Sequence, residues 1–256
     1  MNTLDWAIRY AGKKGLVTRL VTNGWWAENY EEAFKFLSKL KDAGLNELNM
    51  SFGEFHLPYL KDEMKLVYAI KSAQDLGLRC AVANVQTRNS KINVPYIINL
   101  LKKEKIDTSK VLFVTDYVAP TGRGRLIPEE LLVRGNRPDE IGCFEILKAL
   151  SIHPNGDIHL CCGQAMLEIP ELLGGNIKND SIVEVITKAQ KNLLYWWLFA
   201  KGPKGIIEEI TGKSDKYVNI CDACRILFAK HRKELYKKIE NEKYEILLHD
   251  IIESDF

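Results

Sequence analysis

The sequence has almost no excess of charge of one sign and no long hydrophobic run. Its 36 Lys and Arg face 34 Asp and Glu, a formal net charge of +2, which gives no broad field to attract nucleic acid or an anionic membrane. The longest apolar run, Leu193–Ala200, is too short to cross a bilayer, and residues 1–15 contain no apolar stretch of signal-peptide length. We therefore expect a cytoplasmic protein without a nucleic-acid or membrane partner.

Four β-rich runs recur in the first half at the spacing of βα units. They begin at residues 16, 45, 78 and 110, and segments with helical periodicity lie between them at 31–42, 63–75 and 94–105. Strands joined by helices of this length pair in parallel through right-handed crossovers. The chain has 256 residues, 46% of them hydrophobic, so it can bury a core of this kind. The pattern predicts an α/β fold: a layered sheet or a partial (β/α) barrel of four parallel strands.

Polar residues follow the predicted strands. In α/β folds ligands bind beyond the carboxyl ends of the strands, which makes these positions candidates for a binding site. Ser51 and Glu54 follow the second run, Asn84 lies near the end of the third, and Pro120 follows the fourth. The same residue types also form ordinary turns, so turn formation stays an alternative for each of them.

Five of the six cysteines fall between Cys143 and Cys224, and this clustering is the first functional lead. In a reducing compartment, clustered thiols favour metal binding over disulfides. Cys161 and Cys162 close an expected β-hairpin whose turn is Asn155-Gly156. Because side chains alternate across a strand, these two thiols should point to opposite faces, and only one of them should reach a given metal.

Cys221-Asp222-Ala223-Cys224 is a CxxC motif, which lets two thiolates reach one ion or cluster from a single turn. It precedes an expected amphipathic helix over residues 226–249. A thioredoxin-type redox pair would leave Cys143 and Cys161 without a role, and a structural zinc site usually uses two close pairs. An iron-sulfur cluster takes four thiolates from dispersed positions and is favoured over zinc, which stays open. The remaining cysteine, Cys80, is expected in the core.

These residues together resemble the radical S-adenosylmethionine (SAM) enzymes that carry a C-terminal SPASM or twitch domain. Cys143, twelve residues, Gly156, four residues and Cys161 resemble the opening motif of those domains, and Cys221 with Cys224 resembles the pair that completes one auxiliary cluster. The resemblance implies that Cys143, Cys161, Cys221 and Cys224 bind one auxiliary 4Fe-4S cluster. It also implies a small α+β twitch-like domain over residues 138–256, with a β-hairpin and a C-terminal helix, after a partial barrel over residues 1–137.

The first half resembles the later part of the radical SAM barrel. By that resemblance, Ser51 and Glu54 face the ribose and amino-acid end of SAM, Asn84 lies beside them, and the backbone at Pro120 approaches the adenine. The CxxxCxxC motif that holds the SAM cluster in this family does not occur in the sequence, and the first two strands of the barrel are absent. We therefore expect a truncated or degenerate protein that binds SAM only as part of a complete barrel and cannot cleave it alone.

The resemblance implies a parent activity of radical modification, with an unknown peptide or small molecule as the substrate. The alternative is a non-catalytic iron-sulfur or zinc-binding module that acts through a partner protein. A sheet edge left by the absent strands would carry unpaired backbone groups, which invite pairing with another chain. We therefore expect self-association through that edge.

Overall fold

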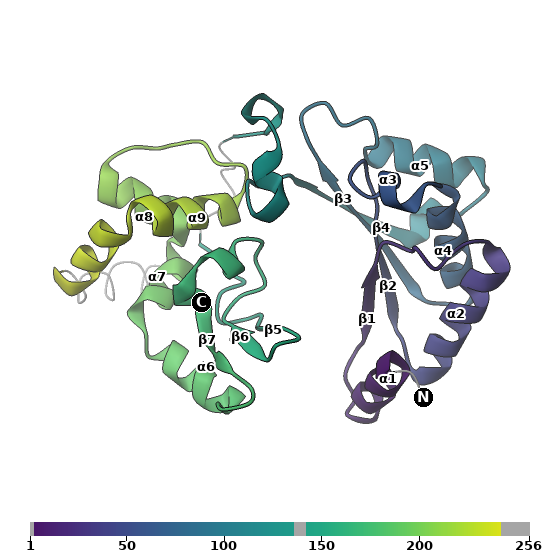
Figure 1. Cartoon of the computed structure of the whole chain (residues 1–256), viewed down its shortest axis with the longest axis horizontal. Coiled ribbons are helices and arrows are strands. Elements are labelled where there is room, and N and C mark those ends of the chain that lie inside the picture. The colour runs from purple at the N-terminus through teal and green to yellow at the C-terminus, as the bar shows by residue number, and fades with distance from the viewer. Residues whose placement is uncertain (1–2, 136–141, 242–256) are drawn as a thin grey trace. The chain divides into compact units, whose positions relative to one another are not determined.

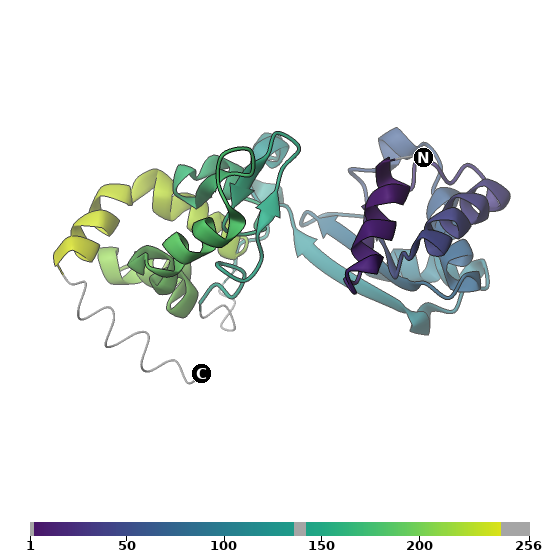
Figure 2. The ribbon, with the colours of Figure 1, turned by 90° about the horizontal axis from the view of Figure 1, so that it is seen from below.

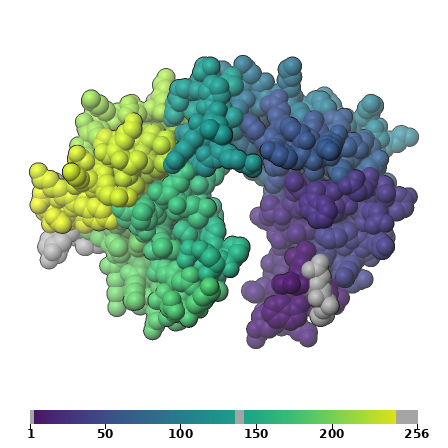
Figure 3. Space-filling view, viewed as in Figure 1, coloured from purple at the N-terminus to yellow at the C-terminus, as the bar shows by residue number. Residues whose placement is uncertain are grey.

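The computed structural model describes residues 3–135 and 142–241, and its contacts divide the chain into two compact units, residues 1–117 and 118–256. Each unit has a hydrophobic core of its own. The colours of Figure 1 identify both units in the space-filling view, where unit 1 runs from purple to teal and unit 2 from teal to yellow (Figure 3). The boundary expected between residues 137 and 138 lies outside the described residues, and the contacts place the division at the end of the fourth strand instead.

Unit 1 is a four-stranded parallel sheet with helices packed on one face (Figure 1). Its elements are α1 (Thr3–Lys13), β1 (Arg19–Thr22), α2 (Tyr30–Ala43), β2 (Glu47–Ser51), α3 (Leu57–Leu60), α4 (Met64–Asp75), β3 (Arg79–Gln86), α5 (Val94–Lys103) and β4 (Val111–Tyr117). The strands lie in the order β1-β2-β3-β4, with Leu48 opposite Cys80 and Cys80 opposite Val111. The prediction of four parallel strands is confirmed.

Helices α2 and α5 begin where local signals place them. Asn29 accepts a hydrogen bond from the backbone N–H of Glu32 at 2.9 Å, and Asn93 accepts one from Tyr96 at 3.0 Å. Together with α4, these helices cover one face of the sheet (Figures 1 and 2). Their aliphatic side chains are buried against it. Cys80 lies in this core, as expected, and burial raises the pKa of its thiol to about 11.

The face of the sheet opposite these helices leaves apolar side chains open. Val21 on β1 is 62% exposed and Leu112 on β4 is 63% exposed, and the strand register places both on this face. In the described part of the chain, β1 pairs with β2 alone and therefore forms one edge of the sheet. The self-association expected through such an edge stays a prediction.

Unit 2 combines a three-stranded antiparallel sheet with helices. Its named elements are β5 (Ser151–Ile152), β6 (Asp157–His159), β7 (Leu173–Asn176), α6 (Ile182–Gln190), α7 (Leu193–Ala200), α8 (Gly202–Thr211) and α9 (Ile220–Lys230), with short 3-10 turns between them. The predicted hairpin is confirmed: Ile152 pairs with Ile158 across a turn in which Gly156 has a φ of 97°. No helix in the two described ranges is long and apolar enough to cross a membrane.

Two predictions for unit 2 are wrong in detail. The helix expected over residues 226–249 begins at Ile220, because Asn219 caps it by accepting a hydrogen bond from the N–H of Asp222 at 3.1 Å. It ends at Lys230, residues 232–241 are helical again, and the rest lies outside the described residues. Strand β6 ends before Cys161 and Cys162, since the N–H of Leu160 already turns to the carbonyl of Leu172 at 2.9 Å.

Candidate metal centre

Cys143 is held against helix α7 by the backbone. Its N–H donates to the carbonyl oxygens of Leu198 and Phe199 at 2.9 and 3.1 Å. The preceding Gly142 has a φ of 77°, and a Cβ at this position would stand 2.2 Å from the carbonyl oxygen of Phe199. Glycine is therefore needed for so close an approach. Its neighbour Cys143 packs, half-buried, against the core of unit 2.

Cys161 and Cys162 follow β6 and lie in different environments. Cys161 is 7% exposed and belongs to the core of unit 2. Cys162 is exposed, and its Sγ lies 3.6 Å from a carboxylate oxygen of Glu145. Because β6 ends at His159, alternation across a strand is not the cause of this contrast. The contrast leaves Cys161 as the buried thiol of the pair.

Cys221 and Cys224 lie in the first turn of α9. Residues three apart share one face of a helix, so both thiols point the same way, and both are half-buried against the core of unit 2. The unpaired N–H groups and the dipole at a helix N-terminus favour negative charge, which suits a pair of thiolates. The cap at Asn219 fixes where this turn starts, and it thereby fixes both cysteines.

Thiols from separate segments meet beside Gly163. A Cβ at Gly163 would stand 2.9 Å from the Sγ of Cys221 and 3.8 Å from the Sγ of Cys161. Burial is the main cause that raises the pKa of Cys161 to about 11, and charge on Cys143 and Cys221 contributes. Burial likewise raises the pKa of Cys224 well above its usual value, followed by charge on Cys143, Cys221 and Cys161. The four predicted ligands are thus electrostatic neighbours in one partly buried region.

Burial and neighbouring cysteine charge both raise the pKa of Cys161 and of Cys224, so these thiols need positive charge nearby before they can become thiolates beside Cys143 and Cys221. A bound metal supplies that charge and deprotonates its thiol ligands. An all-sulfur donor set suits zinc or an iron-sulfur cluster. Within residues 3–135 and 142–241, no group of three or more His, Cys, Asp or Glu side chains is arranged to hold a metal ion. The four thiols are therefore neighbours that do not form a closed shell around one ion.

The segment that carries these thiols matches a known family. Residues 143–225 match the family model of SPASM, an iron-sulfur cluster-binding domain. This segment is a SPASM-type domain. The match starts at Cys143 and ends one residue after Cys224, so it encloses all four predicted ligands. A comparison with curated proteins finds no match. The iron-sulfur character expected from the sequence is confirmed, whereas the cluster type and the ligand set stay predictions.

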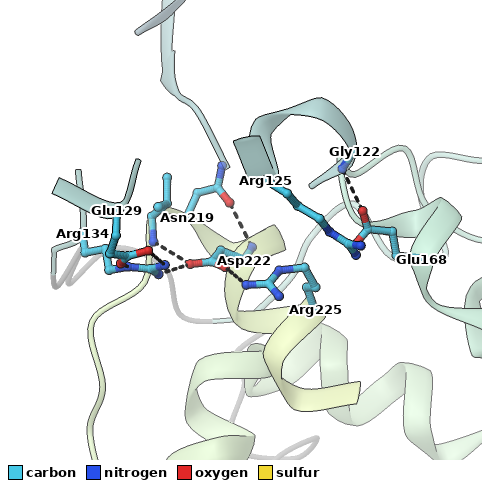
Figure 4. A network of polar contacts seen from close by, with 9 residues as sticks. Gly122, Arg125, Glu129, Arg134, Glu168, Asn219, Asp222 and Arg225 are labelled. Atoms are coloured by element: carbon cyan, nitrogen blue, oxygen red, sulfur yellow. Dashed lines mark hydrogen bonds and ion pairs between the residues drawn. The ribbon is translucent and has the colours of Figure 1, made fainter. Parts of the chain in front are cut away.

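Asp222 locks the CxxC turn of the SPASM-type domain. Its side chain is fully buried, and the carboxylate accepts hydrogen bonds from Arg134 Nη1 at 2.5 Å and Arg225 Nη2 at 2.8 Å (Figure 4). It also accepts the N–H of Val218 at 3.1 Å. Arg134 lies 88 residues earlier and pairs with Glu129 as well. The turn between the two cysteines is therefore held by a distant segment and by its own helix, and such contacts orient the side chains that bind a metal.

Asn84, in unit 1, lies where the sequence placed it. It is 1% exposed, and its Nδ2 donates to the carbonyl oxygens of Phe52 and Ile92 at 2.9 and 3.1 Å. A Cβ at Gly53 would stand 2.8 Å from the same Nδ2, so the side chain lies against the loop after β2. Both amide hydrogens bind backbone, and the residue joins the loops that follow β2 and β3.

The other two candidates of unit 1 belong to the loop that Asn84 holds. Ser51 is the last residue of β2 and is half-buried. Glu54 accepts a hydrogen bond from the backbone N–H of Lys91 at 2.5 Å. The three predicted residues of unit 1 therefore gather at one end of the sheet, where ligands bind in parallel α/β folds.

Pro120, the fourth candidate, belongs to unit 2, whereas the other three belong to unit 1. The segment after it is fastened to the SPASM-type domain by Glu168. The carboxylate of Glu168 accepts hydrogen bonds from the N–H of Gly122 at 2.8 Å and from Arg125 Nη2 at 2.5 Å (Figure 4). These contacts hold the loop at residues 120–125 in place.

Sequence reasoning missed Gly163 and Asp222. Gly163 directly follows the Cys161-Cys162 pair, and a glycine beside a proposed ligand is a signal for close approach that could have identified it. Asp222 lies inside the CxxC motif, but its main partner Arg134 is far away in the chain, and no local pattern indicates that pairing.

Proposed function

We propose that the SPASM-type domain holds one 4Fe-4S cluster on Cys143, Cys161, Cys221 and Cys224. The observations that support the proposal are that the Sγ atoms of Cys161 and Cys221, from two separate segments, both lie beside Gly163, and that charge on Cys143, Cys161 and Cys221 reaches Cys224, all within the matched residues. Four thiolates match a cluster in which each iron takes one protein ligand. Such a cluster, when bound, supplies one-electron transfer or structural support.

The residues of the chain have distinct parts in holding the cluster. The four thiolates bind it, and Gly163 leaves room where a larger side chain would meet the sulfurs of Cys161 and Cys221. Asp222 and its two arginines hold the CxxC turn in position. Cys162 has no part in ligation, because its exposed thiol contacts Glu145 instead.

Iron content and absorbance of single variants test this ligand set. After anaerobic reconstitution, the parent is expected to hold about four irons and four sulfides per chain and to absorb in the visible range. Cys143→Ala, Cys161→Ala, Cys221→Ala and Cys224→Ala should each lose iron. Cys162→Ala is the matched control, since it removes a neighbouring thiol, and it should keep its iron. Unchanged iron in Cys143→Ala would overturn the four-ligand assignment, and about one zinc per chain without visible absorbance would favour the zinc-binding module.

We further infer that the chain is of the radical SAM type and does not cleave SAM by itself. The four parallel strands before the SPASM-type domain, with Ser51, Glu54 and Asn84 at their carboxyl ends, support the first part. The second part rests on the sequence: cleavage needs a cluster with one open iron, the family holds it on CxxxCxxC, and this motif does not occur here. Four thiolates on one cluster leave no iron open.

The corresponding assay measures 5′-deoxyadenosine. Reconstituted protein is incubated with SAM and dithionite, and no product above a cluster-free control is expected. Production that disappears in Cys143→Ala would show that the cluster of this domain performs the cleavage, and the inference would be wrong. The substrate of the parent activity, a peptide or a small molecule, would then be sought with this chain alone.

A further inference from the structure

A cavity of about 590 Å³ opens in unit 2, between the end of α8, the segment after it and the C-terminal part of α9. All of its lining residues belong to unit 2. The volume lies in the range of small-molecule sites, which is roughly 300–1,000 Å³. The cavity borders α9, the helix that carries Cys221 and Cys224 near its start. None of the six cysteines lines the cavity.

The wall of this cavity is strongly basic. Its cationic or titratable basic residues are Arg134, Lys213, Lys216, Arg225, Lys230 and His231, and the acidic residue in the lining is Asp215. Both arginines are already paired: Arg134 with Glu129 and Asp222, and Arg225 with Asp222. Within the described residues, the side chains of the three lysines make no ion pair, and nearby Glu208 is paired with Lys204. Three lysine charges therefore face one carboxylate.

Two hydrogen-bond donors in the same wall lack an acceptor. The hydroxyl of Tyr217 and the Nε of Arg225 are buried and have no partner in the described part of the chain. Buried polar groups in proteins are almost always paired, so these two donors beside the cavity leave room for an acceptor that the described part of unit 2 does not supply. Ile226 and the ring of Tyr217 are apolar groups of the lining, and the aliphatic stems of the lysines and arginines add further apolar surface below their charged ends.

We propose that this cavity binds a small molecule that carries a di- or triphosphate group. Several negative charges on one ligand match the three lysines without ion pairs, and guanidinium and ammonium groups are the preferred partners of phosphate oxygens. The limited volume selects a small molecule over a polymer. Inorganic triphosphate and an organic phosphate ester share this chemistry.

Calorimetric titration of the full reconstituted chain with inorganic triphosphate tests the proposal. The test variant is Lys213→Gln with Lys216→Gln, which removes two exposed lysines at the cavity. The matched control is Lys188→Gln with Lys191→Gln, which removes two exposed lysines of the same unit away from the cavity. Equal iron content in all three proteins shows that the domain is intact.

We expect saturable binding at about one triphosphate per chain in the parent and in the control. The cavity variant should bind at least about tenfold more weakly, because each charge-assisted hydrogen bond contributes strongly to affinity. A nucleoside triphosphate that binds more tightly than inorganic triphosphate would assign the cavity to an organic phosphate, and the reverse order would assign it to an inorganic di- or triphosphate. Equal loss in both variants, no saturable binding, or binding of a Glu-rich peptide in place of triphosphate would overturn the proposal.

Discussion

Removal of the Asp222 carboxylate is expected to destabilise unit 2 and to weaken its hold on iron. Asp222→Asn keeps the shape of the side chain but removes the charge that pairs with Arg134 and Arg225. The carboxylate is fully buried, and it is the acceptor for both guanidinium groups and for the N–H of Val218. The variant therefore leaves two cationic side chains without their buried partner.

The expected loss of folding free energy depends on how much of the Arg134 and Arg225 side chains is exposed to solvent. Breaking a fully buried ion pair costs about 3–5 kcal/mol, because a charge is left unpaired in the interior. The side chains of Arg134 and Arg225 are 26% and 23% exposed, and Arg134 keeps Glu129 as a partner. Solvent and Glu129 therefore offset part of the loss, and we expect about 2–3 kcal/mol. This is a large part of the roughly 5–15 kcal/mol that stabilises a typical domain.

Urea unfolding of the metal-free chain, followed by circular dichroism, measures this loss. With a slope of about 1–3 kcal/mol per molar urea, the midpoint of the transition of unit 2 should fall by about 1 M. The transition of unit 1 should not move, since the described partners of Asp222 all belong to unit 2. Glu184→Gln is the control, because Glu184 is an exposed carboxylate of the same unit. A midpoint for Asp222→Asn that equals the control would refute the reasoning.

Further predictions concern the metal site, the pH dependence and unit 1. Gly163→Val should lower iron content several-fold with little effect on the metal-free fold, because its Cβ would stand 2.9 Å from the Sγ of Cys221. Iron analysis after reconstitution measures this change, and full occupancy would contradict it. Metal-free protein should lose stability as pH rises from 9 to about 11, because burial raises the pKa of Cys161 from 9.0 to about 11 in the folded state. Between these pH values the unfolded chain releases the thiol proton more readily than the folded chain does, and this difference favours unfolding. Urea midpoints across this range should fall less in Cys161→Ala. Asn84→Ala should destabilise unit 1 by about 2–4 kcal/mol, since two buried carbonyls lose their donor, and an unchanged urea transition would show that the amide is free for another role. Val21→Lys should reduce self-association through β1 in sedimentation, and identical sedimentation of parent and variant would exclude that edge.

Unit 1 could be predicted from the sequence because its signals are local. Four strands recur at nearly constant spacing with helical segments in the three intervals between them, and Asn29 marks the start of its helix within a four-residue pattern. Gly44 marks the end of that helix, where the backbone takes a φ of 110° that glycine adopts readily. The start of α9 was missed although Asn219 caps it in the same way, because the apolar periodicity after Cys224 is stronger than that before it.

The SPASM-type domain could be predicted only as far as its cysteine spacing reaches. Spacing indicates which thiols can share a metal, and burial in the folded chain separates Cys161 from Cys162. Spacing does not indicate what surrounds those thiols. The partner of Asp222 lies 88 residues away, and the choice of Arg134 depends on how the segment before residue 136 returns to α9. Such long-range ion pairs leave no periodic signal in a sequence.

Helix α9 contributes residues both to the proposed metal site and to the basic cavity. Its first turn carries the thiols of Cys221 and Cys224, and its later residues Arg225 and Lys230 line the basic cavity. Asp222 contacts both: it lies between the two cysteines and is bound to Arg225. A phosphate group that drew Arg225 into the cavity would therefore compete with the carboxylate that holds the CxxC turn. If triphosphate binds as proposed, the visible absorbance of the reconstituted domain should respond to it in the parent but not in Asp222→Asn, where that connection is already broken.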